Sequence, residues 1–100
     1  AYGKWELVSV NGESPVAAEQ LYFKTSTSVT LTREGVSYEG QYQFYCNVLT
    51  TYFEQYQNLF QEWRVQTMKD SLMRAVVEFR EMNSDTLDAG SVLEYRKIPL

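Results

Sequence analysis

Six carboxylates in the second half of the chain are the residues whose type could carry out hydrolytic chemistry. They are Glu54, Glu62, Glu78, Glu81, Asp85 and Asp88. Two carboxyl groups cleave a glycosidic bond when they are held at a defined separation and their pKa values are pushed apart. The spacing of these residues in the sequence does not bring any two of them into one cleft. We therefore interpret them as solvated surface charges.

The chain contains one cysteine, Cys46, and no histidine. Imidazole is the usual base that activates a serine or cysteine nucleophile, and that base is missing here. A single thiol without imidazole is a poor zinc site, and it forms no intrachain disulfide. We expect Cys46 to be a small buried apolar residue, and we expect neither enzymatic activity nor a bound metal or cofactor.

Aromatic side chains make up 15% of the sequence and could line a ligand cavity. The candidates are Trp5, Tyr38, Tyr42, Phe44, Phe53, Trp63 and Tyr95. An eight-stranded barrel is just wide enough either to be filled by side chains or to hold one small ligand. Because the chain is short and the rings are large, we favour a filled interior with Trp5 and Trp63 in the core.

A second aromatic group lies in the Tyr- and Gln-rich stretch 41–61, which contains Tyr42, Tyr45, Tyr52 and Tyr56. Tyrosine supplies contact area at low entropic cost and is enriched in protein interfaces. These four residues are therefore candidates for a partner-binding surface. Ordinary outward-facing strand positions would explain them equally well.

The 100 residues are enough for one domain, spanning 1–100, and the 44% apolar content supports a hydrophobic core. The net charge of −4 is spread along the chain without a Lys/Arg cluster, so nucleic acid is disfavoured as a partner. No apolar run approaches the ~20 residues that a membrane-spanning helix needs. We expect a monomer without a membrane span.

Turn chemistry and alternating polarity favour an all-β protein. Asn11-Gly12 and Glu34-Gly35 are suited to tight reversals, and Lys69-Asp70 is a plausible third turn. Gly40 lies inside an alternating segment, where glycine often marks a bulge or bend. We expect an eight-stranded antiparallel meander barrel of the lipocalin-like type. Its approximate strands are 4–10, 21–24, 28–33, 36–46, 50–56, 60–67, 71–80 and 91–98.

Residues 48–82 also fit a different fold. Apolar residues recur there at a spacing of three to four, which is the period of a helix, although β-branched and aromatic types are frequent. The alternative fold is therefore an α+β protein with a helical hairpin at 48–82.

Several segments resemble small exported bacterial lipocalin-like domains, including the META/HslJ group. The segments are the opening 3–12, residues 21–24, Trp63 with Val65 and Met68, residues 70–72, and Leu93 with Tyr95. The resemblance implies a barrel whose first-strand tryptophan closes one end, and it carries no catalytic motif. It also implies export to the periplasm or anchoring at the outer membrane, where many members carry a lipidated cysteine that would precede Ala1.

The resulting functional hypothesis is a non-enzymatic bacterial cell-envelope domain that binds a protein partner or a small apolar ligand. The alternative is a peptidase inhibitor that inserts an exposed loop into a protease cleft. Two segments qualify, 13–20 and 83–90. We favour the first, because its small apolar residues Pro15, Val16, Ala17 and Ala18 suit many endopeptidase subsites and proline stiffens the approach.

Overall fold

A computed structural model describes residues 2–83, 85–86 and 89–99, and it contains nine strands and no helix within them. The strands are β1 (Gly3–Val10), β2 (Glu19–Phe23), β3 (Ser28–Arg33), β4 (Val36–Tyr45), β5 (Val48–Phe53), β6 (Leu59–Met68), β7 (Leu72–Met82), β8 (Asp85–Thr86) and β9 (Val92–Ile98).

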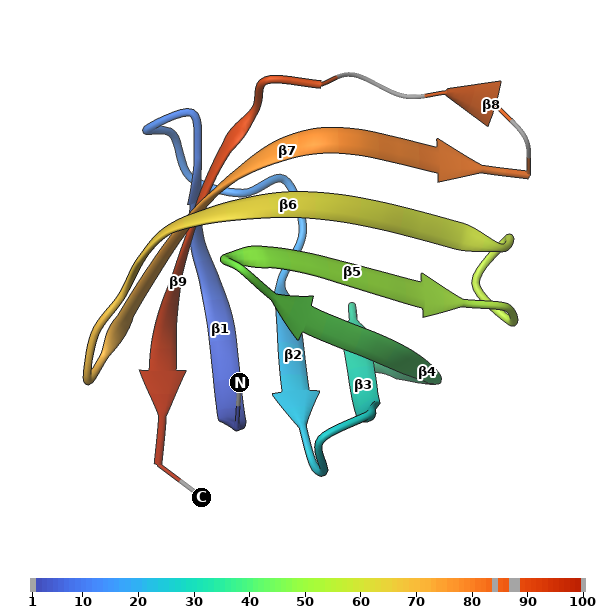
Figure 1. Ribbon diagram of the computed structural model, residues 1–100, viewed down its shortest axis with the longest axis horizontal. Coiled ribbons are helices and arrows are strands. Elements are labelled where there is room, and N and C mark those ends of the chain that lie inside the picture. Colours follow the sequence, from blue (N-terminus) through green and yellow to red (C-terminus); the bar gives the residue numbers. More distant parts are fainter. Residues whose placement is uncertain (1, 84, 87–88, 100) are drawn as a thin grey trace.

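Eight of these strands form a closed antiparallel barrel. β1 to β7 pair in sequence order, and β9 inserts between β7 and β1 to close the ring. The two-residue β8 pairs only with the end of β7, outside the ring. β5, β6 and β7 run across β1, β2 and β9 at a steep angle (Figure 1). The predicted all-β meander barrel is confirmed, and its architecture is consistent with a lipocalin-like fold.

Tight turns set the register of the hairpins. Asn11 and Glu34 adopt φ values of 53° and 52°, and the glycine that follows each is also left-handed, as the turn residues predict. A further two-residue turn at Cys46-Asn47 has φ values of 51° and 64°. Cys46 is exposed there, so its predicted burial is wrong. The apolar thiol sits where the backbone reverses, outside the alternating part of β4.

The helical hairpin at 48–82 is also wrong, because the described residues of this segment form β5, β6, β7 and their turns. Leu49 and Phe53 are buried on β5, and Leu59 and Trp63 are buried on β6. A spacing of four is close to one helical turn, but it is also a multiple of the two-residue strand period. The pattern therefore did not distinguish a helix from two inward-facing strands.

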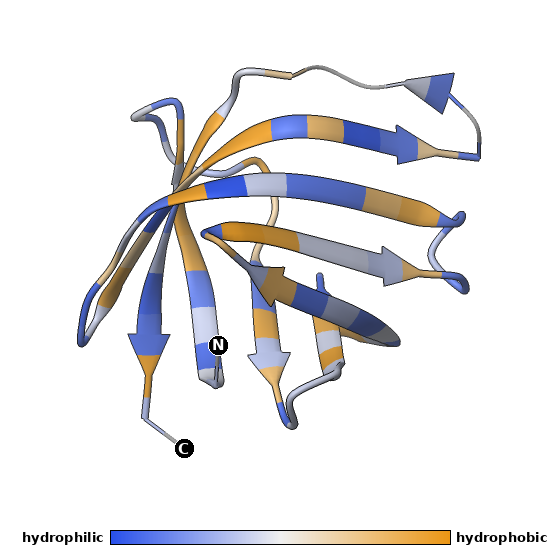
Figure 2. Ribbon diagram, in the orientation of Figure 1, coloured by the Kyte–Doolittle hydropathy of each residue, from blue (hydrophilic) through white to orange (hydrophobic). Residues whose placement is uncertain are grey.

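The barrel interior is filled by side chains from both halves of the sheet. Apolar and polar residues alternate along many strands (Figure 2). Trp5 and Trp63 are 2% and 1% exposed, which confirms their predicted place in the core. The Trp63 ring stacks on Tyr95, with centroids 5.5 Å apart. Trp5 lies at the end of the barrel near the chain termini, where the Lys97 ammonium approaches its ring.

Gly40 marks the point where β4 changes partner. Residues 36–41 of β4 pair with β3, whereas residues 41–45 pair with β5. A Cβ at Gly40 would collide with the Phe53 ring and the Tyr52 carbonyl oxygen. The missing side chain therefore lets Phe53 pack under β4 while the strand turns away from β5.

Candidate functional site

The principal candidate site lies at one end of the barrel, which we call the barrel mouth. Two cavities of about 170 and 190 Å³ open there, and both are lined by Glu19, Arg33 and Arg80. The remaining lining is largely apolar. It comprises Leu31, Tyr56, Leu59, Gln61 and Met82 in the first cavity, and Leu7, Val10, Pro15, Val16, Ala17 and Leu93 in the second.

Glu19, at the start of β2, is held by two partners. Arg33 Nη1 donates a 3.0 Å hydrogen bond to Glu19 Oε1, and the Tyr95 hydroxyl donates a 2.9 Å hydrogen bond to Oε2. The Glu19 side chain is only 16% exposed, so this carboxylate is largely shielded from water. Burial, and then the charge and hydrogen bond of Glu19, raise the pKa of the Tyr95 phenol well above its ordinary value.

Arg80, near the end of β7, has a different environment. Its Nε donates a 2.9 Å hydrogen bond to Gln61 Oε1, and Gln61 Nε2 donates to the Thr51 hydroxyl. Among the residues that the structure describes, no carboxylate lies within salt-bridge distance of the Arg80 guanidinium. Its positive charge at the mouth is therefore not neutralised by an adjacent acid.

The balance of charge at the mouth is one carboxylate against two guanidiniums. Glu19 is committed to Arg33 and Tyr95, which leaves the Arg80 charge in excess. A partly enclosed site weakens screening by water, so a fixed cation there attracts an anion more strongly than it would on an open surface. The arrangement suits a small ligand that has an apolar body and one negatively charged group.

The four predicted loop residues lie beside this site. Pro15 and Ala17 are half-buried and line one cavity together with Val16, whose side chain is fully exposed at 101%. Ala18 is exposed, and its carbonyl oxygen accepts a hydrogen bond from the Glu34 backbone N–H. The segment is therefore a pinned rim of the barrel mouth. The competing segment 83–90 includes residues outside the described part of the chain.

The four predicted tyrosines do not share one surface. Tyr42 is 6% exposed and its hydroxyl donates a hydrogen bond to the carbonyl oxygen of Thr25, in the turn between β2 and β3, whereas Tyr56 lines the mouth. Tyr45 and Tyr52 are the exposed members, at 74% and 38%. The four therefore do not form one binding surface: alternation along β4 sends Tyr42 and Tyr45 to opposite faces, and Tyr56 lies in the turn between β5 and β6.

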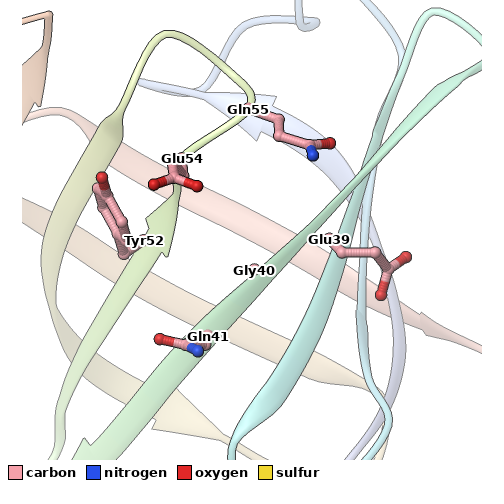
Figure 3. Close-up of a pocket in the computed structure, with 6 residues that line it drawn as sticks. All are labelled: Glu39, Gly40, Gln41, Tyr52, Glu54 and Gln55. Carbon is pink, nitrogen blue, oxygen red and sulfur yellow. The ribbon is translucent and has the colours of Figure 1, made fainter.

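A second hollow lies on the side of the barrel, between β4 and β5. It has a volume of about 420 Å³ and is lined by Glu39, Gly40, Gln41, Tyr52, Glu54 and Gln55. Figure 3 shows β4 diverging from β5 on the two sides of this hollow. We call it the side groove. Its lining is polar and contains two carboxylates but no guanidinium, so its chemistry is opposite to that of the mouth.

Of the remaining candidate acids, one is engaged in an ion pair at the surface. Glu78 pairs with Arg64 on the outer surface, with Nη2 and Oε1 3.1 Å apart. No group of three or more His, Cys, Asp or Glu side chains that could hold a metal occurs among the described residues. Asp88 lies outside those residues.

Comparison of the chain with family models, with curated proteins and with solved structures gives no match. Within the described residues, no helix is long and apolar enough to cross a membrane.

Sequence reasoning missed all three charged residues at the barrel mouth. Arg33 follows the buried Leu31 by two positions, so alternation alone assigns it to the inner face. Alternation did not predict an inward position for Arg80. A register shift pairs Trp63 with Val77 but Glu62 with Phe79, which makes Glu78 an extra residue on β7. This bulge reverses the alternation and turns Arg80 toward the mouth.

Proposed function

We propose that the protein is a non-enzymatic binding domain that holds a small anionic ligand with an apolar body at the barrel mouth. The observation that carries the proposal is the Arg80 guanidinium, which lines both cavities without a carboxylate partner among the described residues. The apolar wall supplies a surface for the body of the ligand, and Arg80 supplies charge-assisted hydrogen bonds for its head.

The size of the cavities limits the ligand. The smaller cavity, of about 170 Å³, has room for a short-chain molecule and is too small for a long lipid. The filled barrel interior blocks deeper entry. The resemblance of the chain to exported lipocalin-like domains supports a cell-envelope setting for this function.

Titration with hexanoate and with its neutral counterpart 1-hexanol tests the proposal, with binding followed by NMR chemical-shift changes. We expect hexanoate to perturb amides around the mouth and to bind at least ~10-fold more tightly than hexanol, which corresponds to about 1.4 kcal/mol. Arg80→Gln should remove this preference, and Arg80→Lys should keep part of it. Arg74→Gln, an exposed change on the same strand, is the matched control and should bind as the unaltered protein does.

Two results would contradict the proposal. One is the absence of mouth perturbations with either compound at millimolar concentration. The other is binding that is equally strong for hexanoate and hexanol and indifferent to Arg80→Gln. Equal binding of the two compounds would mean that the mouth holds an apolar ligand but that the Arg80 guanidinium does not contribute to its binding.

A specific feature also favours peptidase inhibition as a second candidate function. Val16 is fully exposed at the tip of a segment whose ends are fixed by backbone hydrogen bonds, between Val10 and Glu13 on one side and from Glu34 to Ala18 on the other. A pre-organised loop loses little entropy when it enters a protease cleft. The exposed side chain would occupy one subsite.

Titration against serine, cysteine and metallo-endopeptidases at near-stoichiometric concentration tests this candidate function. Inhibition should be lost in Val16→Asp and kept in Leu72→Asp, which alters an exposed aliphatic residue at the start of β7. No inhibition of any class, or equal inhibition by both variants, would exclude the loop as an inhibitory element.

A further inference from the structure

The first half of β4 has one edge without a strand partner. Residues 36–41 pair with β3 on one side, but on the other side pairing with β5 begins only at Gln41, opposite Tyr52. Among the described residues, no strand lies against the remaining edge of 36–40. The side groove opens along this edge, as Figure 3 shows.

The register identifies which backbone groups face the groove. A two-residue turn is closed by a hydrogen-bonded pair, which here is Arg33 with Val36. Hydrogen-bonded and non-hydrogen-bonded pairs alternate along an antiparallel ladder, so Tyr38 and Gly40 also bond to β3. The bond from Tyr42 N to the Thr27 carbonyl oxygen continues the same alternation. Ser37 and Glu39 consequently direct their backbone N–H and C=O groups away from β3, toward the groove.

The charge at this edge is acidic. Glu39 and Glu54 line the groove from its two sides, and its described lining contains no Lys or Arg. Lys24 contacts Glu39 from β3's side of the strand, with Nζ 3.1 Å from Oε1. The Thr30 hydroxyl donates a 2.9 Å hydrogen bond to Glu39 Oε2, so both oxygens of Glu39 have a partner, and its carboxylate points away from Glu54 (Figure 3). Glu54 therefore supplies the negative charge that faces the groove without an ion-pair partner among the described residues.

We propose that the side groove binds an extended segment of a partner protein, which adds as a strand to β4 and carries lysine or arginine at alternate positions. Backbone hydrogen bonds to Ser37 and Glu39 would supply the pairing, as in other complexes formed by strand addition. The five residues of the free edge span about 16 Å at ~3.3 Å per residue, enough for a short segment. A basic side chain of the segment would meet Glu54, which lines the groove.

A second copy of this chain is a poorer occupant. Pairing of two β4 edges would bring the same acidic side chains together, and like charges across a strand pair are destabilising. The proposal is independent of ligand binding at the barrel mouth, because the groove shares none of its lining residues with the two mouth cavities.

The probe is a blocked hexapeptide in which lysine alternates with valine, compared with a twin in which glutamate replaces lysine. Binding is followed by NMR and by amide hydrogen exchange at 36–40. We expect the lysine peptide to slow exchange at Ser37 and Glu39 more than at Tyr38, whose amide already bonds to β3. The glutamate peptide should leave exchange unchanged. Protection elsewhere, or equal protection by both peptides, would overturn the proposal.

Two variants at Ser37 test whether the lysine peptide binds through backbone hydrogen bonds or only through its charge. Ser37→Pro removes the N–H that faces the groove and leaves the β3 ladder in place, and it should weaken the lysine peptide at least ~10-fold. Ser37→Ala also loses the hydroxyl contact to Thr32, as Ser37→Pro does, but it keeps the backbone N–H. It should therefore bind the lysine peptide as the unaltered protein does. Equal binding by both variants would contradict strand addition. Protection of Ser37 and Glu39 by concentrated protein alone would identify a second copy as the occupant instead.

Discussion

The Tyr95 hydroxyl donates a 2.9 Å hydrogen bond to Glu19 Oε2 across the inside of the barrel. Tyr95 lies on β9 and Glu19 on β2, and β1 separates these two strands in the sheet. The bond therefore joins strands that share no backbone ladder. Because Glu19 also binds Arg33, the same carboxylate links the core to the charged rim of the mouth.

Tyr95→Phe should destabilise the protein by about 1–3 kcal/mol, because it leaves a shielded carboxylate oxygen without its donor. Urea unfolding measures the change. Tyr45→Phe is the control, since Tyr45 is 74% exposed and its hydroxyl should contribute little. Equal unfolding midpoints for Tyr95→Phe and the unaltered protein would mean that the hydrogen bond makes no net contribution.

The same tyrosine should make stability depend on alkaline pH. Burial raises the pKa of folded Tyr95 above its ordinary value of 10.0, so the folded protein holds the proton more tightly than the unfolded chain. This contribution is complete below pH ~10 and is lost as pH rises from there toward the folded pKa. The free energy of unfolding, measured with urea at increasing pH, should fall, and it should fall less steeply in Tyr95→Phe. An identical slope in the variant would rule out Tyr95 as its source.

Gly40→Ala should cost about 1–3 kcal/mol through overpacking, because the new methyl group meets both the Phe53 ring and a backbone oxygen of β5. Thermal or urea unfolding reports the loss. Gln41→Ala, the next residue along the strand and exposed, should stay within ~0.5 kcal/mol. A fully stable Gly40→Ala protein would show that β4 has room to move away from β5.

The turn at Cys46-Asn47 offers a stabilising change. Both residues have positive φ, and Asn-Gly is the pair best suited to such a two-residue turn. The double substitution Cys46→Asn, Asn47→Gly should add ~0.5–1 kcal/mol, seen as a higher urea midpoint. Glu34→Asn at the turn before β4 is a parallel case, with φ of 52°. A lower midpoint in the double variant would count against the left-handed turn geometry.

Glu39 should titrate below its ordinary carboxyl value. Hydrogen bonds from Lys24 and then from Thr30 lower its pKa, so its contribution to stability is present above the unfolded pKa and is lost as pH falls through the folded one. Carboxyl NMR titration should show the pKa rising in Lys24→Gln and unchanged in Lys69→Gln. If the pKa of Glu39 were the same in Lys24→Gln as in the unaltered protein, the ion pair with Lys24 would not be the cause of its lowering.

The strand and turn pattern of this protein is local, and much of it was therefore predictable. A turn spans only four residues and depends on their own backbone preferences. The positive φ values at Asn11-Gly12 and Glu34-Gly35 therefore set these reversals independently of the rest of the fold. Alternation predicted the inward direction of Trp5 and Trp63 because the side-chain period of a strand is two. Alternation gave the wrong position for Cys46. The expected strand ended at residue 46, whereas β4 ends at Tyr45 and Cys46 begins the turn.

By itself, the sequence favoured the all-β class without excluding a helical hairpin at 48–82, and it predicted most strand positions and the burial of both tryptophans. Only the tertiary structure decided the candidate sites. Arg80 faces the mouth because a bulge against β6 shifts the phase of β7, and the bulge depends on pairing between strands. Glu19 meets Tyr95 because the barrel closes. The free edge of β4 begins where β4 leaves β5, beside the contact of Gly40 with Phe53, two residues whose proximity no local periodicity encodes.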